Sequence, residues 1–484
     1  MPPEPVSLGQ LAEAAGGRVV GDPGILVSEV THDSRGAGPG VLFVAIRGFT
    51  VDGHRFVAQA RAAGSPAVCV EEGSGDGGPA LVVADTRAAM GPVAAFVHGE
   101  PSRHLRLVGV TGTNGKTTTC HLVEAIVSAA GLVPAVVGTL GARLAGQAMP
   151  LARTTPEASD FQRLLGRMVA GGVDVAAVEV SSHALVLGRV AGSRFAVAAF
   201  TNLSQDHLDF HPDMESYYLA KAALFAPGLA ERAVVWVDNP WGERLAAECP
   251  LPVTRAGWRL PADISAAGVD LRIDGSTFLL VGAGPAVQVR LRLAGEFNVS
   301  NALVAAGIAS ALGIGADTIA AGIGMVASVP GRFEIVATER NCTVVVDYAH
   351  TPDGVAAVIG AARRLSGAGR VIAVVGAGGD RDRGKRPLMG AAAAAADLAL
   401  ITSDNPRSED PGAIIDEVLA GAAAGPAEVR VEADRRLAIR AALEAAGPDD
   451  VVLILGKGHE TGQQFADRTL PFDDRVVARE EAAR

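Results

Sequence analysis

The segment from Leu107 to Ile126 concentrates residue types that bind phosphate. Leu107 to Val110 predict a buried strand, and the residues from Lys116 onward predict a helix. Backbone N–H groups in the loop between them would point at phosphate oxygens. The residues that we expect to contact the nucleotide in this way are Gly112, Thr113, Asn114 and Gly115, with Thr118 just beyond. Lys116 would bridge the β- and γ-phosphates, and the Thr117 hydroxyl would hold Mg²⁺.

The glycine spacing of this loop departs from the strict pattern G-x-x-x-x-G-K-[ST] by one residue. Val110 stands where the first glycine is required, and the upstream glycine is Gly109. A glycine-rich turn without a ligand is the alternative. Strand, glycine pair, lysine, hydroxyl run and amphipathic helix nevertheless coincide here, which favours a nucleoside triphosphate as the ligand.

Two polar clusters follow other predicted strands, where ligands bind in open α/β sheets. Glu179 ends an apolar run, and His207 lies in a segment that also contains Asp206, Asp209 and His211. Oxygen ligands are usual for Mg²⁺, so a histidine ligand would indicate a second ion. The alternatives are a carboxylate paired with a core cation and a solvated loop.

Lys221 lies among alanines and aromatic residues on a predicted amphipathic helix, YYLAKAALF. A lysine on such a helix normally extends its ammonium group to water. By its position alone, this residue does not indicate a function.

Length and composition indicate a multidomain α/β protein. A chain of 484 residues is too long for one ordinary core and suggests about three domains. Val-rich runs alternate with Ala- and Gly-rich stretches, as in buried parallel strands covered by helices. The borders that we expect give units at 1–103, 104–332 and 333–484. A hinge is expected near residues 330 to 334.

Charge and cysteine usage exclude several classes of function. The net charge is −11 and no Lys/Arg stripe occurs, so the pattern of a nucleic-acid-binding protein is absent. Four scattered cysteines without a CxxC pair argue against a disulfide framework or a structural zinc site. With no signal-peptide pattern and no long apolar window, we expect a cytoplasmic protein without membrane insertion.

Motifs along nearly the whole chain together resemble the Mur ligase family. In order, they are GTNGKTT, TTPE, EVSSHAL, NLSQDHLDFH, YYLAKAALF, GEFNVSNALVA, PGRFE, DYAHTPD, GAGGDRDRGKRPLMG, DNPR and GKGHE. The resemblance implies a UDP-sugar-binding α/β domain, a central P-loop ATPase-type domain with a mostly parallel sheet, and a C-terminal Rossmann-like domain that binds the amino acid. It also implies a monomer that acts in cytoplasmic peptidoglycan precursor synthesis.

The activity that this resemblance implies is ATP-driven amide bond formation with two Mg²⁺ ions. The substrates would be UDP-N-acetylmuramoyl-L-alanyl-D-glutamate and meso-2,6-diaminopimelate. Transfer of the γ-phosphoryl group to a carboxylate gives an acyl phosphate, which the amine then attacks. Lys116 would neutralise the transferring group, and Glu179 and His207 match ligands of the second ion. Lys221 matches a lysine that the family carries as a CO₂-derived carbamate, because burial would keep its amine neutral.

The remaining site residues are carried over from the same motifs. Residues that would close on ATP at the junction of the second and third units are Asn298, Arg332, Asp347 and His350. Ser34 matches the contact to the uridine end, and contacts to the muramoyl dipeptide are matched by Thr154, Thr155, Ser182 and Arg189. Some relatives have Gln two residues before that arginine. This chain has Leu187 there, so one polar contact is lost and must fall to another group or to water.

The motif Asp404-Asn405-Pro406-Arg407 indicates which amino acid is added. In the relatives that add diaminopimelate, it supplies an arginine to the distal carboxylate, helped by residues matching Arg381, Gly456 and Glu460. A guanidinium can hold that carboxylate through two hydrogen bonds. Lysine has an ammonium there, and like charges at about 4 Å would cost roughly 4 kcal/mol at an effective dielectric of 20.

Other classes of protein stay open at this point. A lysine-adding ligase or a folylpolyglutamate synthetase would share the ATP apparatus. A P-loop kinase would phosphorylate a hydroxyl, and a silent scaffold would bind nucleotide without turnover. The segment after VIAVV resembles a dinucleotide motif, but Arg381 stands where a third small residue is needed.

Overall fold

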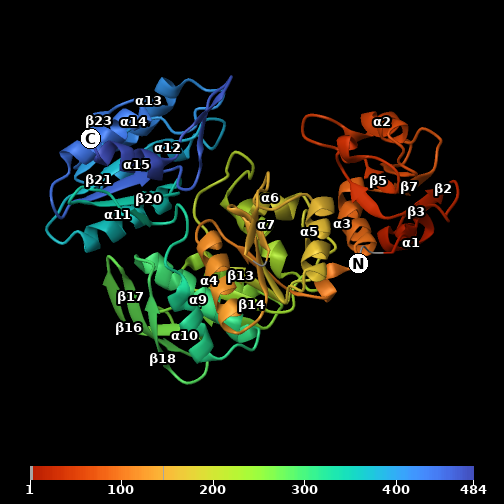
Figure 1. Cartoon of the computed structure of the whole chain (residues 1–484), viewed down its shortest axis with the longest axis horizontal. Coiled ribbons are helices and arrows are strands. Elements are labelled where there is room, and N and C mark those ends of the chain that lie inside the picture. Colours follow the sequence, from red (N-terminus) through yellow and green to blue (C-terminus); the bar gives the residue numbers. More distant parts are fainter. Residues whose placement is uncertain (1–3, 145, 424) are drawn as a thin grey trace.

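The computed structural model describes residues 4–144, 146–423 and 425–484, which form three α/β units in succession along the chain (Figure 1). The predicted fold class is confirmed, because each unit contains a largely parallel sheet with helices packed on it. The unit borders at residues 103 and 332 remain a proposal.

The N-terminal unit contains a five-stranded sheet in the order β2-β7-β6-β5-β4, in which only β2 runs antiparallel. Its strands are β1 (Val6–Ser7), β2 (Arg18–Val20), β3 (Leu26–Val27), β4 (Glu29–Thr31), β5 (Val41–Val44), β6 (Val68–Glu71) and β7 (Ala80–Val83). Its helices are α1 (Leu8–Ala15), α2 (Val57–Ala62) and α3 (Thr86–Val97). The Asp85 side chain accepts hydrogen bonds from the first backbone N–H groups of α3, which fixes where that helix begins.

The central unit is built on an eight-stranded sheet, β11-β10-β9-β12-β8-β13-β14-β15, with only β10 and β11 antiparallel to their neighbours. Its strands are β8 (Arg106–Thr111), β9 (Pro134–Gly138), β10 (Gly141–Leu144), β11 (Gln147–Met149), β12 (Val175–Glu179), β13 (Val197–Phe200), β14 (Ala233–Trp236) and β15 (Val253–Ala256). Its helices are α4 (Lys116–Ala129), α5 (Ala158–Ala170), α6 (Ser182–Val186), α7 (Met214–Ala222), α8 (Pro240–Glu248), α9 (Glu296–Ala311) and α10 (Ala316–Met325).

A small antiparallel sheet extends from this unit, where the sequence alternates over residues 269 to 293. It contains β16 (Ser265–Arg272), β17 (Gly275–Val281) and β18 (Val287–Leu291). Figure 1 shows it beside α10, on the side of the central unit away from the N-terminal unit. Phe278 and Leu280 on one face of β17 are buried in the central core, while Leu279 between them is exposed.

The C-terminal unit contains a six-stranded sheet in the order β19-β20-β24-β21-β22-β23, antiparallel only between β19 and β20. Its strands are β19 (Glu334–Val336), β20 (Thr343–Asp347), β21 (Val371–Val375), β22 (Leu398–Ile401), β23 (Glu428–Val431), β24 (Val451–Leu455), β25 (Gly462–Gln464) and β26 (Thr469–Pro471). Its helices are α11 (Pro352–Leu365), α12 (Lys385–Ala393), α13 (Pro411–Ala422), α14 (Arg435–Ala445) and α15 (Asp474–Ala482).

Strand register determines which side chains meet at the edge of the central sheet. Glu179 at the end of β12 is paired with Val110 of β8, and Phe200 at the end of β13 is paired with Thr111. The loops that follow these three parallel strands therefore leave the sheet at one edge. Among the described residues, no helix has both the length and the apolar character that crossing a membrane requires.

Candidate active site

The phosphate loop connects β8 to α4 through a backbone that only glycine permits at two points. Gly112 has φ 144° and Gly115 has φ 86°. A Cβ at Gly112 would lie 2.0 Å from Thr201 Oγ1, and one at Gly115 would lie 2.2 Å from Asn301 Oδ1. The loop is therefore shaped by close packing as well as by its φ angles. Its Asn114 N–H donates to Asn202 Oδ1 at 2.9 Å.

Lys116, the first residue of α4, folds its side chain back over the loop. Its Nζ donates to the carbonyl oxygens of Gly112 and Thr113, each at 2.8 Å. Burial lowers the pKa of this lysine, and the nearby Glu179 carboxylate acts in the opposite direction. The ammonium group thus lies where a phosphate bound in the loop would replace the carbonyl oxygens as its partner.

Glu179 is buried at the end of β12 and is held on both oxygens. Thr139 donates its N–H to Oε1 at 2.9 Å and its hydroxyl to Oε2 at 3.0 Å, and Thr117 Oγ1 donates to Oε2 at 3.1 Å. Arg332, at the expected border between the central and C-terminal units, donates to Thr117 Oγ1 at 2.9 Å. The carboxylate and the hydroxyl expected to bind metal are therefore in direct contact.

His207 lies in the loop after β13 with a left-handed backbone, φ 56°. Burial lowers its pKa to about 3, so the imidazole is neutral and able to act as a ligand at neutral pH. The adjacent Asp206 is almost fully buried, and its Oδ2 is 3.5 Å from Nε2 of both His207 and His350. Burial would raise the pKa of Asp206, but hydrogen bonding from His350 and the charge of the paired Lys385 hold it well below its usual range.

Lys221 on α7 is buried rather than extended to water, in contrast to the usual behaviour of a lysine on such a helix. Its Nζ donates to the carbonyl oxygen of Gly112 at 2.8 Å and lies 4.5 Å from the centre of the Tyr217 ring. Burial, followed by repulsion from Lys116, lowers the pKa of Lys221 well below its ordinary value. The amine therefore lies close to the phosphate loop, where burial favours its neutral form.

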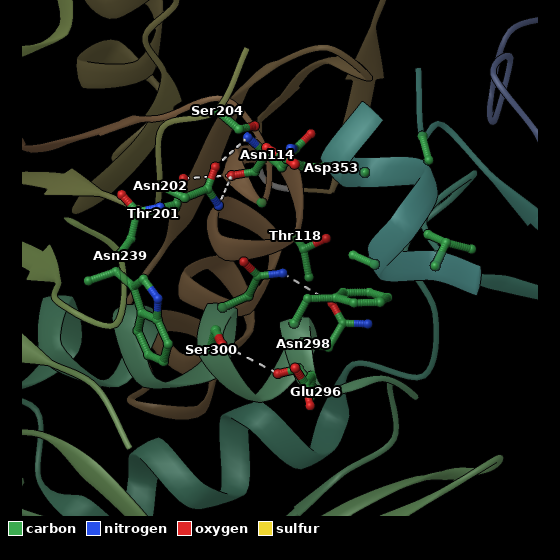
Figure 2. A pocket seen from close by; sticks show the side chains of 18 of the residues that line it. Asn114, Thr118, Thr201, Asn202, Ser204, Asn239, Glu296, Asn298, Ser300 and Asp353 are labelled. Carbon is green, nitrogen blue, oxygen red and sulfur yellow. Dashed lines mark hydrogen bonds between the residues drawn. The ribbon is translucent and has the colours of Figure 1, made fainter. Parts of the chain in front are cut away.

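Two cavities meet at the phosphate loop. The larger, about 680 Å³, lies between the central and C-terminal units, and Figure 2 shows the side chains of Asn114, Thr118 and Asn298 around it. The smaller, about 370 Å³, contains the reactive groups: Lys116, Thr117, Glu179, His207 and Arg381. Asn114, Gly115, Arg332 and Tyr348 line both cavities.

The residues expected to close on ATP lie around this junction. Asn298 in the first turn of α9 and Asp347 at the end of β20 line the larger cavity, and His350 lines the smaller one. The Asp347 carboxylate accepts hydrogen bonds from the backbone N–H groups of Phe333 at 2.6 Å and Ala349 at 2.7 Å. It therefore fixes the backbone where the two units are connected. Burial raises its pKa.

The residues expected to bind the muramoyl dipeptide lie mostly in the smaller cavity. Thr154, Thr155 and Arg189 line it, together with Ser181. Ser182 differs, since its hydroxyl is buried and 2.9 Å from His211 Nε2. Ser34 is in the N-terminal unit, in the 3-10 turn Ser34–Gly36 that follows β4.

The residues expected to bind the amino acid meet at one edge of the C-terminal sheet. Asn405 Nδ2 donates to Glu460 Oε2 at 2.7 Å, and the backbone N–H of Gly379 donates to the Asn405 carbonyl oxygen at 2.9 Å. Gly456, with φ 113°, allows Asp404 to approach, because a Cβ there would lie 2.4 Å from Asp404 Oδ2. Pro406 packs against the glycine loop that leads to Arg381.

Arg407 itself has a left-handed backbone, φ 52°, and its guanidinium donates to the carbonyl oxygen of Gly379. Burial and the charge of Arg381 lower its pKa. The positive charges of Arg381 and Arg407 therefore act on each other, and among the described residues neither arginine forms an ion pair with a carboxylate.

Sequence reasoning missed several side chains that hold this site together. Lys385 forms an ion pair with Asp206, and Lys457 contacts both Asn405 and Glu460. Glu157 forms ion pairs with arginines close to Thr155. Lys385 and Lys457 lie inside the motifs GAGGDRDRGKRPLMG and GKGHE, so position within a motif was the available signal. Which partner each would find depends on tertiary packing.

A phosphate loop at a sheet edge, facing a buried carboxylate and histidine across a cavity shared by two α/β units, defines a nucleotide-dependent enzyme. The chain belongs to the Mur ligase family. Family models match along it: "Mur ligase family, catalytic domain" over residues 26–97, "Mur ligase middle domain" over 110–309, and "Mur ligase, glutamate ligase domain" over 331–458.

Curated relatives resemble the chain over nearly its full length. A UDP-N-acetylmuramoyl-L-alanyl-D-glutamate–2,6-diaminopimelate ligase of Streptomyces avermitilis is 45% identical, covering 99% of this chain and 98% of its own. The ligase of the same description from Geobacillus thermodenitrificans is 44% identical, with 95% of each chain covered. A solved structure of such a ligase is 32% identical, with a TM-score of 0.71 over 99% of both chains.

Proposed function

We propose that this protein is an ATP-dependent ligase that joins meso-2,6-diaminopimelate to UDP-N-acetylmuramoyl-L-alanyl-D-glutamate, in peptidoglycan precursor synthesis. Relatives at 41 to 45% identity carry this activity in their names. The observation that carries the proposal is the smaller cavity, where the phosphate loop, Glu179, Arg189 and Arg381 converge. A phosphoryl donor, a carboxylate acceptor and an amine could meet there.

ATP would bind with its base and ribose in the larger cavity and its phosphates on the loop. Thr118 and Asn298 line the wall of that cavity, and Arg332 lies where the two cavities meet. Lys116 would exchange its two loop carbonyl oxygens for phosphate oxygens. The γ-phosphate would then point into the smaller cavity, toward Glu179 and His207.

The residues in this cavity fit magnesium, which would screen the anions that must approach one another. Thr117 and Glu179 would hold one ion, and Glu179, His207 and a carbamate on Lys221 a second. The described residues contain no ready-made group of three or more His, Cys, Asp or Glu side chains for a metal. Phosphate oxygens and the carbamate would therefore complete the ligand sets. The buried, neutral-prone amine of Lys221 suits reaction with CO₂.

The chemistry would follow from this geometry in two steps. A D-glutamyl carboxylate oxygen attacks the γ-phosphorus, the bond to the bridging oxygen breaks, and ADP leaves. The amine of diaminopimelate then attacks the acyl phosphate carbon, loses a proton, and expels inorganic phosphate. Arg332 at the border of the two units and His350 of the C-terminal unit reach this region, so closure of the C-terminal unit would exclude water from the acyl phosphate.

Diaminopimelate would lie against the Asp404–Arg407 segment, with its distal carboxylate on Arg407 and Arg381. Glu460 and Asp404 would face the ammonium group of the same end. Burial raises the pKa of Asp404, so a nearby ammonium would favour its charged form. A diamino diacid satisfies both signs of charge, whereas lysine satisfies only one.

The test is an assay of purified protein with ATP, Mg²⁺, the UDP-muramoyl dipeptide and a panel of amino acids. We expect phosphate release to require both the dipeptide and meso-diaminopimelate, with a tripeptide product detected by mass. Phosphate release without any amino acid would indicate a kinase or an ATPase. Equal rates with lysine would contradict the proposed specificity.

A further inference from the structure

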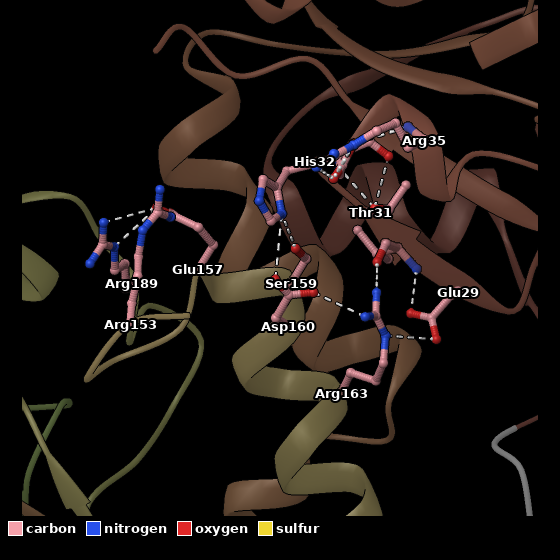
Figure 3. A network of polar contacts seen from close by, with 12 residues as sticks. Glu29, Thr31, His32, Arg35, Arg153, Glu157, Ser159, Asp160, Arg163 and Arg189 are labelled. Atoms are coloured by element: carbon pink, nitrogen blue, oxygen red, sulfur yellow. Dashed lines mark hydrogen bonds and ion pairs between the residues drawn. The ribbon is translucent and has the colours of Figure 1, made fainter. Parts of the chain in front are cut away.

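Glu157 is a buried carboxylate that contacts three arginines, and Figure 3 shows two of them, Arg153 and Arg189, beside it. Its Oε1 lies 2.6 Å from Arg153 Nη1 and 3.0 Å from Arg189 Nη2. Its Oε2 lies 3.5 Å from Nη1 of Arg87, which is in α3 of the N-terminal unit. The residue just before α5 therefore links two units at the wall of the smaller cavity.

The charges in this cluster do not balance. One carboxylate faces three guanidinium groups, and no other carboxylate of the described residues pairs with any of them. Burial lowers the pKa of Arg189, and the charges of Arg153 and Arg87 lower it further. Clustered positive charge of this kind attracts an anionic ligand.

Arg153 and Arg189 share one oxygen of Glu157, so their guanidinium groups lie side by side, and both residues line the smaller cavity. Arg189 is held more firmly, since it donates through Nε as well and its side chain is only 11% exposed. The Arg153 side chain is 53% exposed and has donors free for a ligand.

One position close to Arg189 in sequence is apolar. Leu187 follows α6, two residues before Arg189, where some relatives have a glutamine. The leucine has no donor for a substrate carboxylate, so a second donor beside Arg189 must come from elsewhere. Among the residues lining this cavity, Arg153 is the one that shares the carboxylate oxygen on which Arg189 is held.

We propose that Arg153 is a substrate-positioning residue that, together with Arg189, holds the carboxylate of the D-glutamyl residue that does not react. This inference rests on the proposed function and deepens it. The D-glutamyl residue has two carboxylates, and only one of them is to be phosphorylated. Two guanidinium groups fixed by Glu157 would bind one carboxylate and leave the other facing the phosphate loop and Glu179.

The test combines protein variants with substrates that lack one charge. The two monoamides of the D-glutamyl residue are prepared, and the one that still turns over retains the reacting carboxylate. For Arg153→Ala, we expect kcat/KM for the diacid substrate to fall about 10- to 100-fold, as for loss of a charged hydrogen bond. With the productive monoamide, the same variant should differ from wild type by less than about 3-fold.

Arg153→Lys should regain part of the loss, because it keeps the charge without the planar pair of donors. Arg194→Ala is the matched control, since Arg194 pairs with Glu231 on the surface of the same unit. A calorimetric Kd for each substrate gives the same comparison without turnover. If Arg153→Ala weakened binding of the diacid and of the monoamide equally, or weakened binding of neither, Arg153 would not bind that carboxylate.

Failure of the role assigned to Arg153 is distinguishable from failure of the proposed function. A wild-type protein that neither binds nor consumes the UDP-muramoyl dipeptide would overturn the function, and the role of Arg153 with it. A wild-type protein that forms the tripeptide, while Arg153→Ala treats the two substrates alike, would overturn the role of Arg153 only.

Discussion

Asp206 Oδ1 lies 2.9 Å from Lys385 Nζ, and both side chains are buried where the central unit meets the C-terminal unit. Asp206 follows β13, and Lys385 begins α12. His350 approaches the same carboxylate from the C-terminal side at 3.5 Å. This buried pair therefore links the loop that carries His207 to the unit expected to bind the amino acid.

Removing Lys385 should open this junction. A buried pair that loses one partner costs about 3 to 5 kcal/mol, because the remaining charge is uncompensated. In Lys385→Met, we expect the C-terminal unit to move away, which lets water reach Asp206. The KM for ATP should rise, and small-angle scattering should give a larger radius of gyration.

Arg383→Met is the control, because Arg383 pairs with Glu417 within the C-terminal unit. Adding Asp206→Asn to Lys385→Met removes the unpaired charge, so the double variant should be more compact than Lys385→Met alone. A Lys385→Met protein with the scattering curve and KM of wild type would contradict this role for the pair.

Gly331, within the expected hinge, is predicted to tolerate no side chain. Its φ is +66°, and a Cβ there would lie 2.2 Å from the backbone nitrogen of His459. Gly331→Ala should displace the loop that carries His459 and Glu460, so the KM for diaminopimelate should rise at least 10-fold. The free energy of unfolding should fall by about 1 to 3 kcal/mol.

Gly367→Ala separates the effect of φ from that of contact. Gly367 has φ +58°, and a Cβ there would meet nothing within 4 Å. The Gly367→Ala variant should lose a little stability and have an unchanged KM for diaminopimelate. Equal kinetic effects of the two alanine variants would mean that contact with His459 is not the cause.

The sequence predicted the parallel strands well because their signal is local. The apolar runs that became β12, β20, β21, β22 and β24 are continuous and bounded by turn residues, as strands covered on both faces must be. The helical segment that ends at Ala62 was harder to predict. It begins as the 3-10 turn Gly53–Phe56, before α2, because the Asp52 side chain accepts the His54 N–H and fixes a tighter first turn.

Site residues could be predicted from the sequence only where they lie together in one short segment. The phosphate loop is such a segment, because strand, glycines, lysine and threonine are contiguous. The partner of Asp206 is 179 residues away in sequence, and Arg87 lies 70 residues before Glu157. Such pairs depend on how units pack, and no local pattern encodes that. The burial of Ser182 against His211 has the same origin.

Lys221→Ala should abolish turnover and be partly rescued by a short carboxylic acid such as acetate or formate. The alanine leaves a space beside Gly112 in which a small carboxylate could replace the proposed carbamate. Phosphate release measured against acid concentration would test this. Lys116→Ala is the control, because its loss removes a phosphate contact that no carboxylate restores. Full activity of Lys221→Ala without any added acid would refute the carbamate.

Arg407→Ala should lose preference for diaminopimelate over lysine while binding ATP as before. The guanidinium and the distal carboxylate would form two charge-assisted hydrogen bonds, so selectivity should fall about 10- to 1000-fold. The ratio of kcat/KM for the two amino acids measures it. Arg430→Ala, an exposed arginine of β23 in the same unit, should leave the ratio unchanged. An unaltered ratio in Arg407→Ala would exclude the assigned contact.

The protein should lose stability on mild acidification because buried histidines are held neutral. From an ordinary value of 6.5, burial lowers the pKa of His211 and of His459 to about 4 and that of His207 to about 3. Between about pH 6.5 and pH 4 the unfolded chain binds protons that the folded chain does not. As the pH is lowered through that window, the free energy of unfolding therefore decreases, by up to about 1.4 kcal/mol per pH unit for each histidine.

His459→Gln isolates one of these contributions. His459 Nδ1 is buried without a hydrogen-bond partner among the described residues, so protonation there would place an unpaired charge beside Arg332. The thermal unfolding midpoint of His459→Gln should fall less than that of wild type between pH 6.5 and pH 4.5. His104→Gln, at an exposed position, is the control and should follow wild type. Parallel curves for His459→Gln and wild type would mean that this imidazole is protonated equally in the folded and unfolded chains.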